Sequence, residues 1–225
     1  KGEAPYTSDA LVFGTMYDML LFERDKAMSE YVILNEGDVL ERCKTKTIEA
    51  KNPKLTKDYK EVKAAMEEEY KAKGQTLTSS ADWKTANDMV ERLAVCGLLK
   101  KRLTGKYQVE FNEDIDGVPL RGFLDCLGDG FITDSKSSRS VDKFRYDVNS
   151  FSYDIQAYIY TKVFDIKDYY WVVQEKTHPY YPAEIKCSEE TLFKGEMKYH
   201  QALENIKAYL NDKKPEVNCY ASFVV

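Results

Sequence analysis

The stretch VPLRGFLDCLGDGFITDSK, residues 118–136, decides the fold that we predict for this chain. Its apolar runs favour two strands joined by a Gly-Asp-Gly turn. Asp125 and Asp134 are nine residues apart, a spacing that brings the two carboxylates together across a hairpin. Lys136 follows Asp134 by two residues, so both side chains project from the same face of the second strand. The stretch therefore predicts two carboxylates and an ammonium group on one face of a sheet.

This set of residues has the chemistry that metal-assisted cleavage of a phosphodiester requires. Carboxylate oxygens are ligands for hard cations such as Mg²⁺ or Mn²⁺. Lys136 can orient the attacking water or help to deprotonate it for in-line attack at phosphorus. Glu110, on the preceding predicted strand, is a third candidate acid, and three converging acids are costly unless they bind a cation. The alternatives are a plain ion pair between Asp134 and Lys136 and a Glu110 that faces solvent.

Two further groups of residues suit a site that binds phosphates. Gln156 and Tyr160 lie four residues apart on one face of a helix predicted at residues 150–164. The pair can hydrogen-bond a phosphate or a water and brace the acids, although core packing of the tyrosine is an alternative. Hydroxyl groups and cations also follow Lys136 directly, a combination that suits phosphate binding and is equally typical of a solvated loop. These candidates are Ser137, Ser138, Arg139, Lys143 and Arg145.

Composition narrows the classes of protein. Hydrophobic residues make up 43% and charged residues 32% of the 225 residues, as in ordinary globular proteins. The net charge of −5 argues mildly against a nonspecific nucleic-acid coat protein but leaves room for a nuclease with a local basic surface. Only two histidines are present, so oxygen ligands are favoured over a histidine-based zinc site.

The five scattered cysteines include no CxxC pair and favour reduced thiols. We therefore expect a cytoplasmic location, in a bacterium or a phage-infected host. No apolar run approaches the roughly 18 residues of a membrane span, so no membrane partner is expected.

The pattern of the whole chain predicts a single domain over residues 1–225, with a helical N-terminal part at about 9–100, a catalytic sheet core at about 105–187 and a closing helix at about 189–212. The fold class is α/β (α+β), with a central mixed β-sheet flanked by helices. Around residues 31–50 we expect a short strand and an exposed loop. The other predicted helices are 9–23, 56–73 opened by Thr56, 80–100 opened by Ser80, and 150–164. The other predicted strands are 107–111, 118–127, 131–136, 168–176 and 182–187.

The order of these residues resembles the PD-(D/E)XK nuclease superfamily, which has a restriction-endonuclease-like core. More closely, it is similar to the phage-type alkaline exonucleases, the group of lambda exonuclease and RecE (exonuclease VIII). Residues 14–21 resemble the N-terminal signature of that group, residues 77–93 its helix before the first acidic strand, and residues 189–206 its closing helix. The resemblance spans about residues 9–212.

The resemblance implies a role for each acid and for the lysine. Asp125 and Asp134 would be metal ligands, and Glu110 a third acid that acts directly or through water. Lys136 would be the catalytic lysine. Mg²⁺ would be the cofactor, with Mn²⁺ as a substitute.

The resemblance also implies an activity. Such enzymes are 5′→3′ exonucleases on the ends of linear double-stranded DNA, and they leave 3′ single strands that an annealing protein uses in recombination. They form ring-shaped homo-oligomers. Gln156 and Tyr160 would be the helix pair of the family, whereas Asp18 replaces its helical histidine and is either an extra oxygen ligand or a surface acid. A non-catalytic DNA-end-binding or scaffold module and a structure-specific endonuclease are the alternatives on the same fold.

Overall fold

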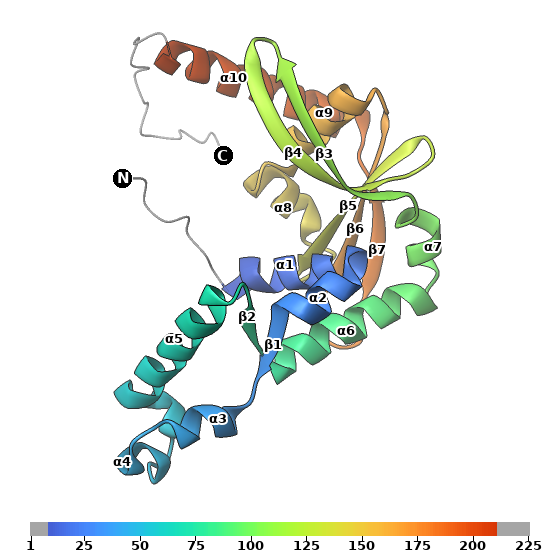
Figure 1. The fold of residues 1–225 in the computed structure, drawn as a ribbon. Coiled ribbons are helices and arrows are strands. Elements are labelled where there is room, and N and C mark those ends of the chain that lie inside the picture. The colour runs from blue at the N-terminus through green and yellow to red at the C-terminus, as the bar shows by residue number, and fades with distance from the viewer. Residues whose placement is uncertain (1–8, 211–225) are drawn as a thin grey trace, which may run out of the picture. The chain divides into compact units, whose positions relative to one another are not determined.

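The computed structural model describes residues 9–210 (Figure 1). The helices are α1 (Asp9–Phe22), α2 (Arg24–Glu30), α3 (Glu36–Glu41), α4 (Thr45–Ile48), the 3-10 helix η1 (Pro53–Leu55), α5 (Lys57–Ala72), α6 (Ser80–Val95), α7 (Leu98–Arg102), α8 (Phe144–Ser150), α9 (Tyr153–Phe164) and α10 (Glu189–Leu210). The strands are β1 (Tyr31–Leu34), β2 (Thr76–Ser79), β3 (Lys106–Ile115), β4 (Val118–Leu127), β5 (Phe131–Ser138), β6 (Asp168–Glu175) and β7 (Pro182–Lys186). β1 and β2 form a parallel pair, and the other strands form one sheet in the order β3-β4-β5-β6-β7. The predicted α/β class is confirmed.

The chain divides into two compact units, each built from three segments. The first unit consists of Lys1–Leu103, Ser135–Val141 and Val172–Ala183, and the second of Thr104–Asp134, Asp142–Trp171 and Glu184–Val225. The prediction of a single domain stays a prediction. In the described range, no helix is both long enough and apolar enough to cross a membrane.

Helices α1 and α6 build the main core of the first unit. Met16, Leu20, Met89 and Leu93 are all at most 1% exposed, as their helical spacing requires. The predicted helix at residues 9–23 is confirmed as α1. The end of β6 reaches this core, because Gln174 accepts a hydrogen bond from Tyr17 of α1 and donates one to the Met89 carbonyl of α6.

A smaller core lies beside β1 and β2, between α3 and α5 in Figure 1. Val39, Tyr59 and Met66 are buried there. The prediction of an exposed loop after the first strand, within residues 31–50, is wrong. This segment forms α3 and then α4, because Val39 packs into this core. The second strand of the pair, β2, was not predicted.

Capping residues begin two helices of the first unit. The Thr56 hydroxyl accepts a hydrogen bond from the backbone N–H of Tyr59, so the predicted start of α5 is confirmed. The predicted cap of α6 is off by one residue, because Ser79 rather than Ser80 accepts from the N–H of Asp82. The predicted helix at 80–100 is divided, since Gly97 has a φ of +81° and separates α6 from α7.

In the second unit, β3 and β4 form the predicted hairpin. Asp116 and Gly117 at its tip both have positive φ, which is the two-residue turn that follows the twist of the strands. One face of the hairpin is covered by α9 and α10 (Figure 1), through a cluster that includes Ile115, Tyr199 and Leu203.

Within the second unit, α9 and α10 approach each other closely at one glycine. A side chain at Gly195 would place its Cβ 2.1 Å from the carbonyl oxygen of Asp154, so only glycine fits. Nearby, Lys198 donates a 2.6 Å hydrogen bond to the Asp154 carboxylate. The packed helices hold the start of α9 against the hairpin that carries Asp125.

Candidate active site

In the second unit, Asp125 and Asp134 lie on neighbouring strands. β4 and β5 pair antiparallel, with Cys126 opposite Thr133. The same register carried one residue further places Asp125 opposite Asp134. Asp134 is 1% exposed and Asp125 is half-buried. Two carboxylates opposite each other on neighbouring strands supply the oxygen ligands that a hard divalent cation prefers.

Tyr169 on β6 faces the same pair of acids. Burial raises the pKa of the Tyr169 phenol well above its ordinary value, and the charges of Asp134 and Asp125 raise it further. Its hydroxyl is buried and has no hydrogen-bond partner within residues 9–210. The phenol therefore stays protonated and can donate to a carboxylate or a water. Sequence reasoning missed Tyr169, because every residue of its strand follows the pattern of a buried strand and no polar spacing marks it.

Gln156 and Tyr160 connect α9 to the acid-bearing strand. The Tyr160 hydroxyl donates a 2.9 Å hydrogen bond to the backbone carbonyl of Phe123, two residues before Asp125. Gln156 Nε2 donates to the Tyr160 hydroxyl at 3.3 Å. The Tyr160 ring is 9% exposed and meets Phe111 edge-on, with 5.6 Å between ring centroids. The pair is thus brought together as predicted, and it braces β4 just before Asp125.

Replacing Tyr160 with phenylalanine tests this bracing role. The ring contact stays while the donor to Phe123 is lost, so we expect a loss of about 1 kcal/mol in the free energy of unfolding. We also expect about a tenfold slower cleavage with a higher half-saturating metal concentration, because a displaced β4 carries Asp125 with it. Tyr158→Phe is the matched control, since this hydroxyl on the same helix donates to Glu196. Denaturant unfolding measures the loss of stability, and initial rates measure cleavage. An equal change in the cleavage rate of the two variants would rule out bracing.

Glu110 has an ion-pair partner of its own. Its carboxylate accepts a 2.6 Å hydrogen bond from Arg121, and its side chain is 49% exposed. Glu110 pairs with Phe123, so it lies on the same face of the hairpin as Asp125. Across residues 9–210, no group of three or more His, Cys, Asp or Glu side chains is placed to hold a metal ion. A role for Glu110 as a third acid stays a prediction.

In the first unit, the end of β5 presents hydroxyl groups and cations. Lys136 and Ser137 are half-buried, whereas Arg139 is exposed. The Ser138 hydroxyl accepts from the N–H of Ser140 at 3.2 Å and closes a turn, so its role is at least partly structural.

Lys176 lies close to Arg139 and was not predicted. Its backbone N–H donates to the Ser138 carbonyl at 3.2 Å. Burial lowers the pKa of Lys176, and the neighbouring charge of Arg139 lowers it further. Two cations held together in this way suit an anion between them.

The remaining cations belong to α8 in the second unit. Lys143 is its N-cap residue. The Arg145 guanidinium stacks over the exposed ring of Tyr146 at 4.8 Å and donates to its hydroxyl. Phosphate binding by these two residues stays a prediction.

Asp18 is half-buried on α1 in the first unit. Its charge contributes to the raised pKa of both Tyr17 and Tyr31, after burial in each case. The role of Asp18, as an extra oxygen ligand or a surface acid, stays a prediction.

The protein has a mixed sheet covered by helices, two acids on neighbouring strands, and a lysine two residues after the second acid. These features define an α/β protein of the restriction-endonuclease-like fold class. The family described as "PDDEXK-like domain of unknown function (DUF3799)" matches residues 1–221. The chain therefore belongs to this PDDEXK-like family, and the predicted PD-(D/E)XK superfamily is confirmed. The narrower likeness to phage-type alkaline exonucleases stays a prediction.

One solved structure shares the fold. A protein from Eubacterium rectale, provisionally described as an exonuclease, superposes with a TM-score of 0.61 at 16% identity, covering 99% of this chain and 79% of its own. That identity shows a shared fold alone. A second structure, SSO0001, gives a TM-score of 0.34 at 15% identity over 84% of this chain and 87% of its own, too low to support an argument. Among curated proteins, none matches this chain.

Proposed function

We propose that this protein is a metal-dependent deoxyribonuclease, most specifically a 5′→3′ exonuclease on linear double-stranded DNA that produces 3′ single strands for recombination. The observation that carries the proposal is the pair Asp125 and Asp134, opposite each other on β4 and β5 with Lys136 two residues further along β5. Membership of a PDDEXK-like family supports a nuclease.

The acid pair fits a hard divalent cation. Mg²⁺ keeps several of its waters and needs only one or two carboxylates together with substrate phosphates, so the absence of a three-acid group among the described residues is no obstacle. Asp125 and Asp134 would hold the cation, which would supply Lewis-acid polarisation of the scissile phosphate. Mn²⁺, with the same preference for oxygen, would substitute.

The residues of the chain divide the remaining tasks. Tyr169 stays protonated, so its hydroxyl is available to donate a hydrogen bond to a metal-bound water or to a carboxylate of the acid pair. The Lys136 ammonium group positions the attacking water by donating a hydrogen bond, and its charge favours the hydroxide that forms when the water releases its proton to solvent. Arg139 and Lys176, which lie together in the first unit, would bind a phosphate of the substrate backbone, and Gln156 with Tyr160 keeps β4 in place.

The finer parts of the proposal come from the resemblance to phage-type exonucleases and from the name of the Eubacterium rectale relative. They are the use of DNA ends, the 5′→3′ polarity, the ring-shaped homo-oligomer and an annealing protein as partner. A DNA-end-binding module without cleavage is the second candidate. Unlike the nuclease, it would not shorten DNA when metal is added.

Digestion of matched linear and circular duplexes tests the function. With Mg²⁺ or Mn²⁺ we expect the linear duplex to shorten, the strand with the labelled 5′ end to be lost first, and the circle to resist because it has no end. A chelator should stop the reaction and added metal should restore it. Cleavage of the circle would instead show an endonuclease. Binding of ends with no shortening in either metal would establish the scaffold module and end the nuclease proposal.

A further inference from the structure

One segment of the first unit has a charge opposite to that of the whole chain. Residues 42–63, the basic segment, contain eight lysines or arginines and three acids, a net charge of +5 in a chain of net charge −5. Its cations are Arg42, Lys44, Lys46, Lys51, Lys54, Lys57, Lys60 and Lys63. A compact positive region on an acidic protein is the electrostatic pattern of a surface that binds a polyanion.

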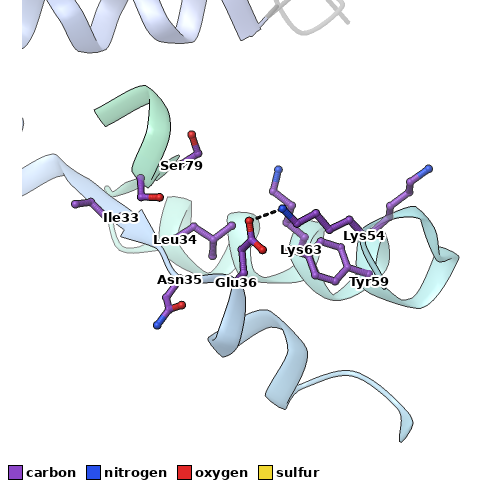
Figure 2. Close-up of a pocket in the computed structure, with 10 residues that line it drawn as sticks. Ile33, Leu34, Asn35, Glu36, Lys54, Tyr59, Lys63 and Ser79 are labelled. Carbon is purple, nitrogen blue, oxygen red and sulfur yellow. Dashed lines mark hydrogen bonds and ion pairs between the residues drawn. The ribbon is translucent and has the colours of Figure 1, made fainter. Parts of the chain in front are cut away.

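The basic segment forms one wall of a large open pocket. The pocket has a volume of about 920 Å³ and is lined by Lys54, Lys60 and Lys63. Figure 2 shows Lys54, Tyr59 and Lys63 on one side, with Leu34 on β1 and Ser79 at the start of α6 on the other. All lining residues belong to the first unit. The volume exceeds what a single phosphate needs and suits a run of several nucleotides.

The lysines of the pocket form only weak, solvent-exposed ion pairs or none. Lys54 forms an ion pair with Glu36, drawn as a dashed line in Figure 2, and both side chains are more than half exposed. Lys63 meets Glu67 at 3.3 Å, also in solvent. In the described part of the chain, Lys60 forms no salt bridge. Exposed pairs of this kind contribute little to stability, so incoming phosphates can replace them at small cost.

The geometry of the wall suits a chain of phosphates. Lys60 and Lys63 are three residues apart on α5, so they share a face and are about 4.5 Å apart along the helix axis. Ser80, the first residue of α6, adds an exposed hydroxyl at a helix N-terminus, where the backbone dipole favours an anion. Three cations and a hydroxyl along one groove can follow a backbone without reading bases.

We propose that this basic pocket is an accessory site that binds the phosphodiester backbone of a nucleic acid. It is built from residues other than the acid pair and Lys136, so it holds the strand instead of cutting it. The choice of DNA as the nucleic acid rests on the proposed function, whereas binding of the backbone does not. Such a site keeps an acidic protein on its polyanionic substrate between turnovers, with a strong dependence on salt.

Binding of a labelled duplex, measured by fluorescence anisotropy in chelator over a series of salt concentrations, tests the proposal without cleavage. The double variant Lys60→Glu with Lys63→Glu should bind more weakly, equally for all sequences. The slope of log affinity against log salt should shrink by about 2, one for each lost phosphate contact. Because the binding measurement contains no metal, unchanged binding by the variant would contradict the accessory site alone. It would not bear on metal-dependent cleavage, which is tested separately.

The matched control is Lys71→Glu with Lys194→Glu, which changes the net charge by the same amount. Both control lysines are exposed and paired with a glutamate on their own helix, outside the pocket. Circular dichroism confirms that each variant is folded. Equal loss of affinity in the two double variants would overturn the proposal, since bulk charge alone would explain it. So would displacement of DNA by dilute inorganic phosphate, which would show a site for a small anion.

Discussion

Replacing Asp134 with asparagine is expected to slow cleavage of linear duplex DNA by about three orders of magnitude. The substitution keeps the shape of a side chain that is 1% exposed and removes the charge that would hold the cation with Asp125. Stabilisation of transition-state charge by a metal contributes several kcal/mol, and each 1.36 kcal/mol is a factor of ten in rate. Initial rates with saturating metal measure the loss.

Thermal unfolding separates this effect from damage to the fold. In chelator, Asp134→Asn should still unfold in one cooperative transition, because the substitution keeps the shape of a buried side chain. Added Mg²⁺ or Mn²⁺ should raise the melting temperature of the wild type, since it binds the native state, but not that of the variant. Asp165→Asn is the control, an exposed acid from another Asp-x-Lys motif. Wild-type activity in Asp134→Asn would refute the proposed metal site.

The sequence predicted those elements whose signals are local. The two-residue turn at Asp116-Gly117, the Thr56 cap and the helical spacing of α1 depend on neighbours in the chain, and all three are present. It missed β2, because TLTS has no strong strand pattern and pairs with β1 about 45 residues earlier. It also missed α3, which depends on Val39 entering a core made with α5.

In the candidate site, strand alternation is the reason for choosing Asp134 and Lys136 among several similar motifs, and this choice stays a prediction. The motif Asp-x-Lys occurs five times. In two of the four instances other than Asp134, the structure shows that the aspartate forms hydrogen bonds within its own part of the fold. Asp58 accepts hydrogen bonds from the backbone N–H of Lys44 and the hydroxyl of Thr47. Asp82 exchanges hydrogen bonds with Ser79 at the start of α6. The motif at Asp212 lies outside the described residues.

Two candidates were beyond prediction from spacing. Tyr169 belongs to a strand whose inner residues are all buried, and only the fold shows that the charges of Asp125 and Asp134 act on its phenol. Lys176 and Arg139 are 37 positions apart, and the end of β5 brings them together. Contacts between strands distant in the chain leave no periodic pattern, so only the structure reveals them.

Replacing Lys136 with methionine is expected to slow cleavage by about 10²–10⁴-fold, the range that a positioned group in proton transfer contributes. Methionine keeps the length of the aliphatic stem, so the half-buried position on β5 stays filled. Unlike Asp134→Asn, this variant should retain the metal-dependent rise in melting temperature, because an ammonium group is no ligand for Mg²⁺ or Mn²⁺. Single-turnover cleavage and thermal unfolding, measured on the same samples, separate the two roles.

Lys167→Met is the matched control, because Lys167 belongs to the Asp165-Ile166-Lys167 motif and its side chain is exposed. It should cleave at the wild-type rate. If Lys136→Met also lost the thermal response to metal, the lysine would act by holding the acid pair in place, and a direct part in deprotonating water would have to be abandoned. If its cleavage were unchanged, strand alternation would have selected the wrong cation, and the nearby pair of Arg139 and Lys176 would be the next to replace.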